Sequence, residues 1–437
     1  MATARARPTT NRQATGMVVS AERMVHGGAA LCRTESGAVA LVRGAVPGET
    51  VRADVRTERG VLLGEAVEVL VASPDRVTAS EHPGLDYSFM TYERQLAEKR
   101  AVVADALSRA RALAGDRASP RLAPEDVTGV VPAPNEWSYR SSVQPAASPE
   151  GLGYRLPGTR EVVVLGEDPV ATPAVRAAWQ LALGLGVNRA AGARELVIRA
   201  NDAGEALVAI VSSAASRALL DLAHALVKGG VTGVMYAPFD PRGRFRSGAE
   251  RLAGARTILQ GYGDVLLTVN ATSFAQPNPE AAGGLYRELA RWAGTGARAA
   301  ELYAGSGAIA FHLAPGFSLV TAIEIDRSAV ERGKRDAERL GLGNVEFVRL
   351  DAREAVIPES TELVVVDPPR AGLSKGVRSA VAASGASRLL YVSCDAATWA
   401  RDVVELEGLG FALTRFVPFD FYPQTHHVEL LSELTRT

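Results

Sequence analysis

The sequence predicts an α/β protein in which a small amino-terminal β-barrel and a mixed α+β domain precede a mostly parallel carboxyl-terminal sheet. The chain has 437 residues, too many for one ordinary domain. Short strands separated by glycine-containing turns fill residues 16–71, a pattern typical of a small barrel. After about residue 298, apolar strands alternate with helical stretches, which indicates a parallel sheet covered on both faces.

Composition excludes several classes of protein. Apolar residues make up 47% and charged residues 22%, and the net charge of −1 argues against a globally basic nucleic-acid binder. Two cysteines, Cys32 and Cys394, provide neither a disulfide framework nor a four-thiolate metal site. No apolar run reaches the length of a membrane helix, and the polar amino-terminal tail is not a secretory signal. We expect a cytoplasmic protein without membrane contact.

Three domains are predicted along the chain. The barrel is expected over residues 10–72 and the central α+β domain over residues 73–270. An amphipathic helix at about 92–114 belongs to the central domain by sequence, and we expect it to pack on the carboxyl-terminal domain, residues 271–437. The last two strands are joined by a short loop, so this pair is predicted to be antiparallel.

A glycine loop follows the first strand of the carboxyl-terminal domain, in E-L-Y-A-G-S-G-A-I-A. Gly305 and Gly307 allow a tight turn and the close approach of a ligand, and a helix amino terminus follows. Glu324 ends the next strand about 20 residues on, where an acid meets ribose hydroxyls in nucleotide-binding units. Asp351, at the end of the third strand, is a further candidate or a solvated acid. The pattern indicates an adenosine ligand and does not choose between NAD and S-adenosylmethionine.

Reactive side chains are expected at the carboxyl ends of the fourth and fifth strands. Two prolines in V-V-V-D-P-P-R hold Asp367 at one strand end, and Y-V-S-C places Cys394 at the next. A lone cysteine is usually a buried structural residue, but this position favours a reactive one. Arg370 favours the thiolate and Asp395 opposes it, so the sequence leaves the pKa of Cys394 open.

The final strand supplies a candidate base. Sheets of this kind commonly insert the last strand beside the fifth, which would place Glu429 near Cys394. A cysteine and a glutamate at one nucleotide crevice suggest covalent addition followed by proton removal. His426 and His427 are competing bases, but adjacent residues of a strand face opposite sides, so at most one of them can face the crevice.

Together these motifs resemble the class I S-adenosylmethionine-dependent RNA 5-methyluridine methyltransferase family. The resemblance is carried by D-P-P-R-A-G-L, Y-V-S-C-D and F-Y-P-Q-T-H-H-V-E, in that order after E-L-Y-A-G-S-G, and it covers nearly the whole chain. V-P-G-E-T-V and A-S-P-D-R-V are similar to an OB-like TRAM barrel that binds RNA. E-W-S-Y-R and S-F-A-Q-P-N-P are similar to elements of the family's central domain and of the approach to its Rossmann-like sheet.

The resemblance implies a reaction and a set of roles. Cys394 would attack carbon 6 of a uracil, carbon 5 would take the methyl group, and Glu429 would remove the carbon 5 proton. Cofactor-binding positions carried over by motif are Gln276, Tyr303, Gly305, Gly307, Glu324, Asp351 and Asp367. The partner is ribosomal or transfer RNA, the protein is expected to be a monomer, and no metal is expected. R-G-R-F-R, residues 242–246, suits either single-stranded RNA or an exposed charged turn.

The chain departs from the family in two places. Many relatives carry a four-cysteine iron–sulfur cluster, whereas this chain reads E-H-P-G-L-D-Y-S-F-M at residues 81–90 and Asp168-Pro169 at a later cysteine position. Two cysteines cannot hold such a cluster, so we expect none. Ala308 stands where many members have asparagine, so one cofactor contact would be missing.

Three alternatives explain fewer of these residues. An amino-group methyltransferase with D-P-P-[YFW] carries an aromatic residue where this chain has Arg370, and it needs no cysteine. A nicotinamide-dependent oxidoreductase accounts for the glycine loop but not for Cys394 and Glu429. A non-catalytic RNA-binding or assembly protein would be expected to have lost this pair.

Overall fold

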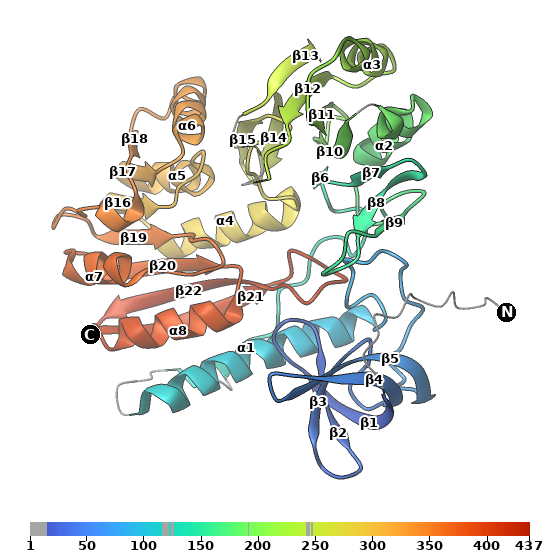
Figure 1. Ribbon diagram of the computed structural model, residues 1–437. Coiled ribbons are helices and arrows are strands. Elements are labelled where there is room, and N and C mark those ends of the chain that lie inside the picture. Colours follow the sequence, from blue (N-terminus) through green and yellow to red (C-terminus); the bar gives the residue numbers. More distant parts are fainter. Residues whose placement is uncertain (1–14, 116–121, 124–125, 191, 242–244, 246–247) are drawn as a thin grey trace. The chain divides into compact units, whose positions relative to one another are not determined.

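The computed structural model describes residues 15–115, 122–123, 126–190, 192–241, 245 and 248–437 (Figure 1). The chain divides into two compact units. One unit holds residues up to Ser80 together with Leu85–Val102 and Gln424–His426, and the other holds Glu81–Gly84, Val103–Pro423 and His427–Thr437. The R-G-R-F-R stretch lies outside the described residues except for Phe245.

The first unit contains a closed five-stranded barrel, as predicted. Its strands follow the order β1-β2-β3-β5-β4, with bounds β1 (Thr15–Met24), β2 (Ala30–Thr34), β3 (Val39–Arg43), β4 (Thr50–Glu58) and β5 (Val61–Val71). Alternate residues of β4 point inward, and Val51, Ala53 and Val55 are buried. The sequence prediction missed β2, which places Cys32 in the barrel core.

A buried ion pair joins the two barrel motifs, V-P-G-E and A-S-P-D-R. Arg76 donates from Nε and Nη2 to the two carboxylate oxygens of Glu49, at 2.5 and 2.7 Å. Backbone N–H groups of Val46 and Ser73 donate to the same carboxylate. These bonds outweigh the effect of burial and hold the pKa of Glu49 below its usual range. Glu49 and Arg76 therefore lock the turn before β4 to the segment after β5.

The central part of the second unit is a mixed sheet with helices on one face. The sheet order is β13-β12-β11-β10-β7-β8-β9, and β6 also pairs with β10. Its strands are β6 (Ser142–Val143), β7 (Ala146–Ser148), β8 (Gly151–Arg155), β9 (Val162–Val164), β10 (Ala193–Ala200), β11 (Ala206–Ser212), β12 (Gly233–Pro238) and β13 (Glu250–Gly254). Two helices, α2 (Pro173–Gly184) and α3 (Arg217–Lys228), pack their buried residues into the core of this sheet. A hairpin of β14 (Ile258–Tyr262) and β15 (Val265–Val269) follows.

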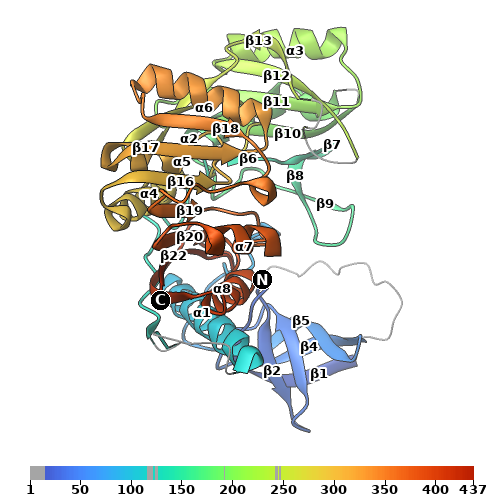
Figure 2. The same cartoon turned by 90° about the vertical axis from the view of Figure 1, so that its left-hand side faces the viewer.

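A seven-stranded sheet forms the carboxyl-terminal part of the second unit. Figure 2 shows β18, β17, β16, β19, β20 and β22 following one another in this order, and β21 pairs with β22 at the edge. The strands are β16 (Gly296–Leu302), β17 (Phe317–Glu324), β18 (Val345–Arg349), β19 (Leu363–Val366), β20 (Arg388–Ser393), β21 (Phe411–Phe419) and β22 (Glu429–Arg436). The first five strands are mutually parallel, and β22 is antiparallel to both neighbours. The predicted parallel sheet and its antiparallel end are confirmed.

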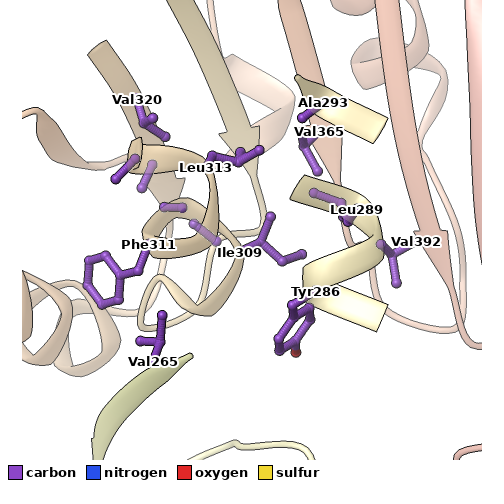
Figure 3. Packing of buried hydrophobic residues seen from close by; sticks show 14 of the residues in the cluster. Val265, Tyr286, Leu289, Ala293, Ile309, Phe311, Leu313, Val320, Val365 and Val392 are labelled. Carbon is purple, nitrogen blue, oxygen red and sulfur yellow. The ribbon is translucent and has the colours of Figure 1, made fainter. Parts of the chain in front are cut away.

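Helices cover both faces of this sheet. Buried residues of α4 (Pro279–Ala293), α5 (Ala308–Leu313) and α6 (Arg327–Leu340) share one core, in which Tyr286, Leu289 and Ile309 pack near Val392 (Figure 3). The opposite core takes residues from α7 (Lys375–Ala383) and α8 (Ala396–Glu407). Val103 and Leu107 of α1 (Tyr92–Ala114) join this second core. Over the described residues, no helix is long and apolar enough to cross a membrane.

Candidate active site

The glycine loop lies at the carboxyl end of β16. Tyr303, Gly305 and Gly307 all have positive φ, at 65°, 55° and 92°. A non-glycine residue in this region is strained, and such residues cluster at functional sites. Gly305 N donates to Glu324 Oε2 at 2.9 Å, and Asp326 N donates to Oε1 at 2.7 Å. The loop is thereby tied to the acid at the end of β17, and contact of Glu324 with a ribose stays a prediction.

Asp351 lies at the end of β18, but its carboxylate already has a partner. Arg353 donates to both oxygens from Nε, at 3.1 and 3.0 Å, and from Nη2 at 2.5 Å. These bonds lower the pKa of Asp351 to about 2. The neighbouring Tyr303 has a raised pKa because it is half-buried and faces Asp351. Cofactor contact by Asp351 stays a prediction, and it would require sharing the carboxylate with Arg353.

Two buried acids lie between the glycine loop and the reactive strands. Asp367 follows β19, and its burial raises its pKa to about 7. Glu301, within β16, is fully buried, and its pKa is well above the usual range because of burial and the nearby Asp367. The carboxylate of Glu301 accepts from the backbone of Ala310, while its Oε2 has no partner among the described residues. Sequence analysis missed Glu301, although it begins the E-L-Y-A-G-S-G motif.

Cys394 lies between β20 and α8, at the carboxyl edge of the sheet. Asp395 caps α8 by accepting from Thr398 N at 2.9 Å. Burial, acting together with Glu429, Asp367 and Asp395, raises the pKa of the Cys394 thiol to about 12, and Arg370 acts in the opposite direction. As expected from the sequence, Asp395 raises the pKa of Cys394 and Arg370 lowers it. Burial and the neighbouring acids therefore favour the neutral thiol in the free protein.

Glu429 is the first residue of β22, which lies between β20 and β21. Ser393 pairs with Leu430 and Phe419 pairs with Glu429, so the carboxyl group enters the sheet at the level of Cys394. The insertion expected from the sequence is confirmed. Glu429 is buried, and its pKa is raised well above the usual range by burial and by Asp367, with Arg370 opposing.

The two candidate histidines precede β22 and have different surroundings. In the first unit, His426 Nδ1 lies 2.6 Å from Asp86 Oδ2, and His426 N donates to Asp86 Oδ1 at 3.0 Å. In the second unit, Arg370 Nη2 lies 3.2 Å from His427 Nε2, and Tyr422 packs edge-on against the His427 ring. His427 therefore contacts the arginine that acts on Cys394 and Glu429.

Gln276 is positioned by aromatic residues that the sequence analysis did not single out. Tyr422 Oη donates to Gln276 Oε1 at 3.3 Å, and Tyr262 Oη donates to Gln276 O at 3.0 Å. Asn278 Nδ2 donates to Phe421 O at 2.9 Å, which joins this loop to the segment before Glu429. Phe274, two residues before Gln276, is 82% exposed.

A polar cluster occupies residues 81–90 and Asp168, the positions where many relatives carry the cysteines of an iron–sulfur cluster. His82 Nε2 lies 3.6 Å from Asp168 Oδ2, and Tyr154 Oη donates to the same oxygen. Val170 N donates to Asp168 Oδ1 at 3.0 Å, and these bonds hold the pKa of the buried Asp168 below its usual range despite its burial. In the part of the chain that the structure describes, no group of three or more His, Cys, Asp and Glu side chains is arranged to hold a metal ion.

This arrangement combines a nucleophile, buried acids and a nucleotide loop. Cys394, Glu429 and Asp367 act on one another electrostatically at the carboxyl edge of the sheet, next to the loop that contains Gly305. Arg370 is the positive group among the charges that act on the cysteine and on Glu429. This cluster therefore carries excess acid, which a cationic ligand would compensate.

The chain is similar to known RNA methyltransferases. A model of the tRNA (uracil-5-)-methyltransferase family matches residues 263–358 and 358–436. An uncharacterized RNA methyltransferase of Thermosynechococcus vestitus is 30% identical over 91% of this chain and 93% of its own length. One of Gloeobacter violaceus is 30% identical over 94% of each chain. The fold is that of the Pyrococcus abyssi tRNA (uracil-54, C5)-methyltransferase, solved with S-adenosyl-L-homocysteine, with a TM-score of 0.78, 23% identity and coverage of 95% and 100% of the two chains.

Proposed function

Because this chain belongs to the tRNA (uracil-5-)-methyltransferase family of RNA methyltransferases, we propose that it methylates carbon 5 of a uridine in ribosomal or transfer RNA. The observation that carries the proposal is the placement of Cys394 directly after β20 and of Glu429 at the start of the adjoining β22, where both interact electrostatically with Asp367. Methylation of an exocyclic amino group would give neither residue a role. Carbon 5 of uracil is a weak nucleophile, so a reaction there benefits from both.

The cluster of acids suits S-adenosylmethionine, which supplies a methyl group on a positively charged sulfur. The carboxyl groups of Glu301, Asp367 and Glu429 are buried with raised pKa values, so a cation would stabilise their charged forms. Glu324 holds the loop at Gly305 and would meet the ribose hydroxyls. Gln276, Tyr303 and Asp367 are proposed to make the remaining contacts.

Cys394 would begin the reaction by forming a bond from its sulfur to carbon 6 of the uracil. Its thiol proton must leave first, and Arg370 is the cationic side chain that favours the thiolate. Addition at carbon 6 makes carbon 5 nucleophilic, so that this atom takes the methyl group. Glu429 would then accept the carbon 5 proton, and the electrons of that bond expel the Cys394 thiolate.

The pKa directions imply that the pair is inactive before the substrates bind. Burial and neighbouring acids favour the neutral forms of both Cys394 and Glu429. A cationic ligand beside Asp367 lowers the pKa values of all three groups and so prepares the thiolate and the carboxylate together. Ligand binding and activation of the nucleophile are linked in this scheme.

The RNA base must leave its stack to reach Cys394, at a cost of a few kcal/mol. Phe274 is exposed on the loop that also holds Gln276, and an exposed aromatic ring of this kind can stack on an extruded base. We assign Phe274 this role. Stacking on Phe274 would offset part of the cost of unstacking.

The proposal is tested with 5-fluorouridine-substituted total RNA and tritium-methyl S-adenosylmethionine. Fluorine cannot leave as a cation, so the adduct should stall after methyl transfer and run as a labelled protein–RNA band in SDS. The band should disappear in Cys394→Ala, and sequencing its RNA would identify the target uridine. If wild-type protein methylates unsubstituted RNA without forming this band, the covalent mechanism is wrong.

A further inference from the structure

One face of helix α8 contacts the backbone of the loop that follows Asp367. Thr398 Oγ1 donates to Arg370 O at 3.1 Å, and Arg401 Nη2 donates to Ala371 O at 2.9 Å. Leu373 N donates to Asp402 Oδ2 at 2.6 Å. Positions three and four residues apart share a helix face, so these three side chains bind successive points of the loop.

Asp402 is fully buried, and side chains from β20, α7 and α8 donate hydrogen bonds to its carboxylate. Tyr391 Oη of β20 donates to Oδ2 at 2.8 Å, and Arg378 Nη1 of α7 donates to Oδ1 at 2.9 Å. Arg401 donates to Oδ1 from Nε at 3.0 Å and from Nη2 at 2.8 Å. A buried carboxylate with this many donors is fixed in place, because losing any of them leaves charge uncompensated.

The loop approaches α8 more closely than a side chain would allow. Gly372 has a φ of 73°, and a Cβ atom built on it would collide with the carboxylate of Asp402 and with the guanidinium of Arg401. The glycine in D-P-P-R-A-G-L is therefore required both by backbone conformation and by contact with α8.

We propose that Thr398, Arg401 and Asp402 are positioning residues that hold the Arg370–Leu373 loop in a fixed place relative to Cys394. Helix α8 begins two residues after Cys394. The same rigid helix therefore adjoins the turn that holds Cys394 and provides the side chains that contact this loop. The loop begins with Arg370, the cation that acts on both Cys394 and Glu429. The inference rests on the proposed role of Cys394 as nucleophile.

A positioning role and a purely structural role predict opposite effects on the thiol. If these residues only support the fold, weakening them loosens the site and makes Cys394 more accessible to reagents. If they hold Arg370 in place, weakening them removes positive charge from the thiol and makes it less reactive, since the thiolate is the nucleophilic form. Reactivity of Cys394 in the absence of RNA therefore separates the two roles.

The test is the rate at which iodoacetamide alkylates Cys394 at pH 8, followed on its peptide by mass spectrometry in the full-length protein. Thr398→Val removes the hydroxyl that bonds to Arg370 O at 3.1 Å and to Asp395 O at 3.3 Å without changing charge, and Arg401→Lys keeps the charge but loses the guanidinium geometry. We expect about three- to tenfold slower alkylation in each, with Arg370→Gln as the reference for full loss. Thr414→Val on the edge strand β21, which loses a bond to Glu433 O four positions beyond Glu429 on β22, and Arg327→Lys on α6 should match wild type.

Cys32 reports opening of the barrel, in which it is buried, and thermal unfolding followed by circular dichroism reports the stability of the second unit, which holds the substituted residues. Unchanged or faster alkylation of Cys394 in both α8 variants, with Cys32 still protected, would overturn the inference. An unchanged rate in Arg370→Gln would overturn it as well. If alkylation is slower in both α8 variants but wild-type protein does not methylate uridine, the proposed function is refuted while the positioning of Arg370 relative to Cys394 is supported.

Discussion

Replacing Glu429 by glutamine separates the two halves of the proposed reaction. Glu429→Gln keeps the size of the side chain and removes its ability to accept the carbon 5 proton. Glu429 is also one of the acids that raise the pKa of Cys394, so the variant has a thiol that ionises more readily. Addition to carbon 6 and methyl transfer should therefore survive, while release of the product should not.

The magnitude follows from the role of a positioned base. Loss of general base catalysis slows proton removal by about 10²- to 10⁴-fold, which corresponds to about 3–5 kcal/mol in the barrier. Because Glu429 is buried at the start of a strand paired on both sides, water has poor access as a substitute base. Covalent intermediate should then accumulate on ordinary uridine RNA, without fluorine.

The assay mixes enzyme in excess with unsubstituted RNA and labelled S-adenosylmethionine, and follows the SDS-stable band and free methylated RNA with time. We expect a persistent labelled band in Glu429→Gln and none in the double variant with Cys394→Ala. Turnover within about tenfold of wild type would refute the role of Glu429, since the range expected for a lost base begins at about 10². A variant that binds cofactor normally but forms no adduct would also refute it.

The remaining predictions concern the cofactor, the RNA and the barrel. Asp367 has a pKa of about 7, so the affinity of the protein for cationic S-adenosylmethionine, measured by calorimetry, should rise as pH increases from 6 to 8. Asp367→Asn should bind the cofactor about 10- to 100-fold more weakly, and its affinity should not change with pH over this range. Phe274→Ala should weaken RNA binding about 5- to 150-fold in filter binding and leave cofactor affinity unchanged. Arg76→Ala should destabilise the barrel by about 3 kcal/mol at pH 7, measured by urea unfolding followed by circular dichroism. This loss should fade in acid, because Glu49 has a depressed folded-state pKa and its contribution is lost as pH falls through that value.

Each of these has an outcome that contradicts it. Equal pH slopes in wild type and Asp367→Asn would assign the titration to another group. Weaker cofactor binding in Phe274→Ala would place that ring in the cofactor site instead of the RNA site. A constant effect of Arg76→Ala between pH 7 and pH 3 would mean that the Glu49 carboxylate is not the source of the lost stability.

The carboxyl-terminal sheet could be predicted from sequence because its signals are local. Strand ends at Asp367 and Cys394 are marked by D-P-P-R and by the end of an apolar run, and the short loop before Glu429 indicates an antiparallel pair. The insertion of β22 beside β20 followed from the usual arrangement of such sheets, and the structure has it. The barrel could be predicted equally well, apart from β2, whose five residues show little alternation of apolar and polar side chains.

The contacts that support the site could not be predicted, because their partners are far apart in sequence. Asp402 meets Leu373, Tyr391 and Arg378, and no motif relates these four positions. In the first unit, Gln95 and Gln424 exchange hydrogen bonds at 2.9 and 2.8 Å across 329 positions. Pattern and propensity describe one segment at a time, whereas these bonds depend on how the segments pack.

The position of β22 also determines when the site can exist during synthesis. This strand follows β21 in the chain but lies between β20 and β21, so a nascent chain that ends before residue 429 can hold the nucleotide loop and Cys394 without their base. Domains fold as the chain emerges, starting from the amino-terminal side. The nucleophile is therefore made before the residue that would release it from a bound base. We therefore expect completion of the sheet to be a late step of folding and the proposed turnover to require insertion of the final strand.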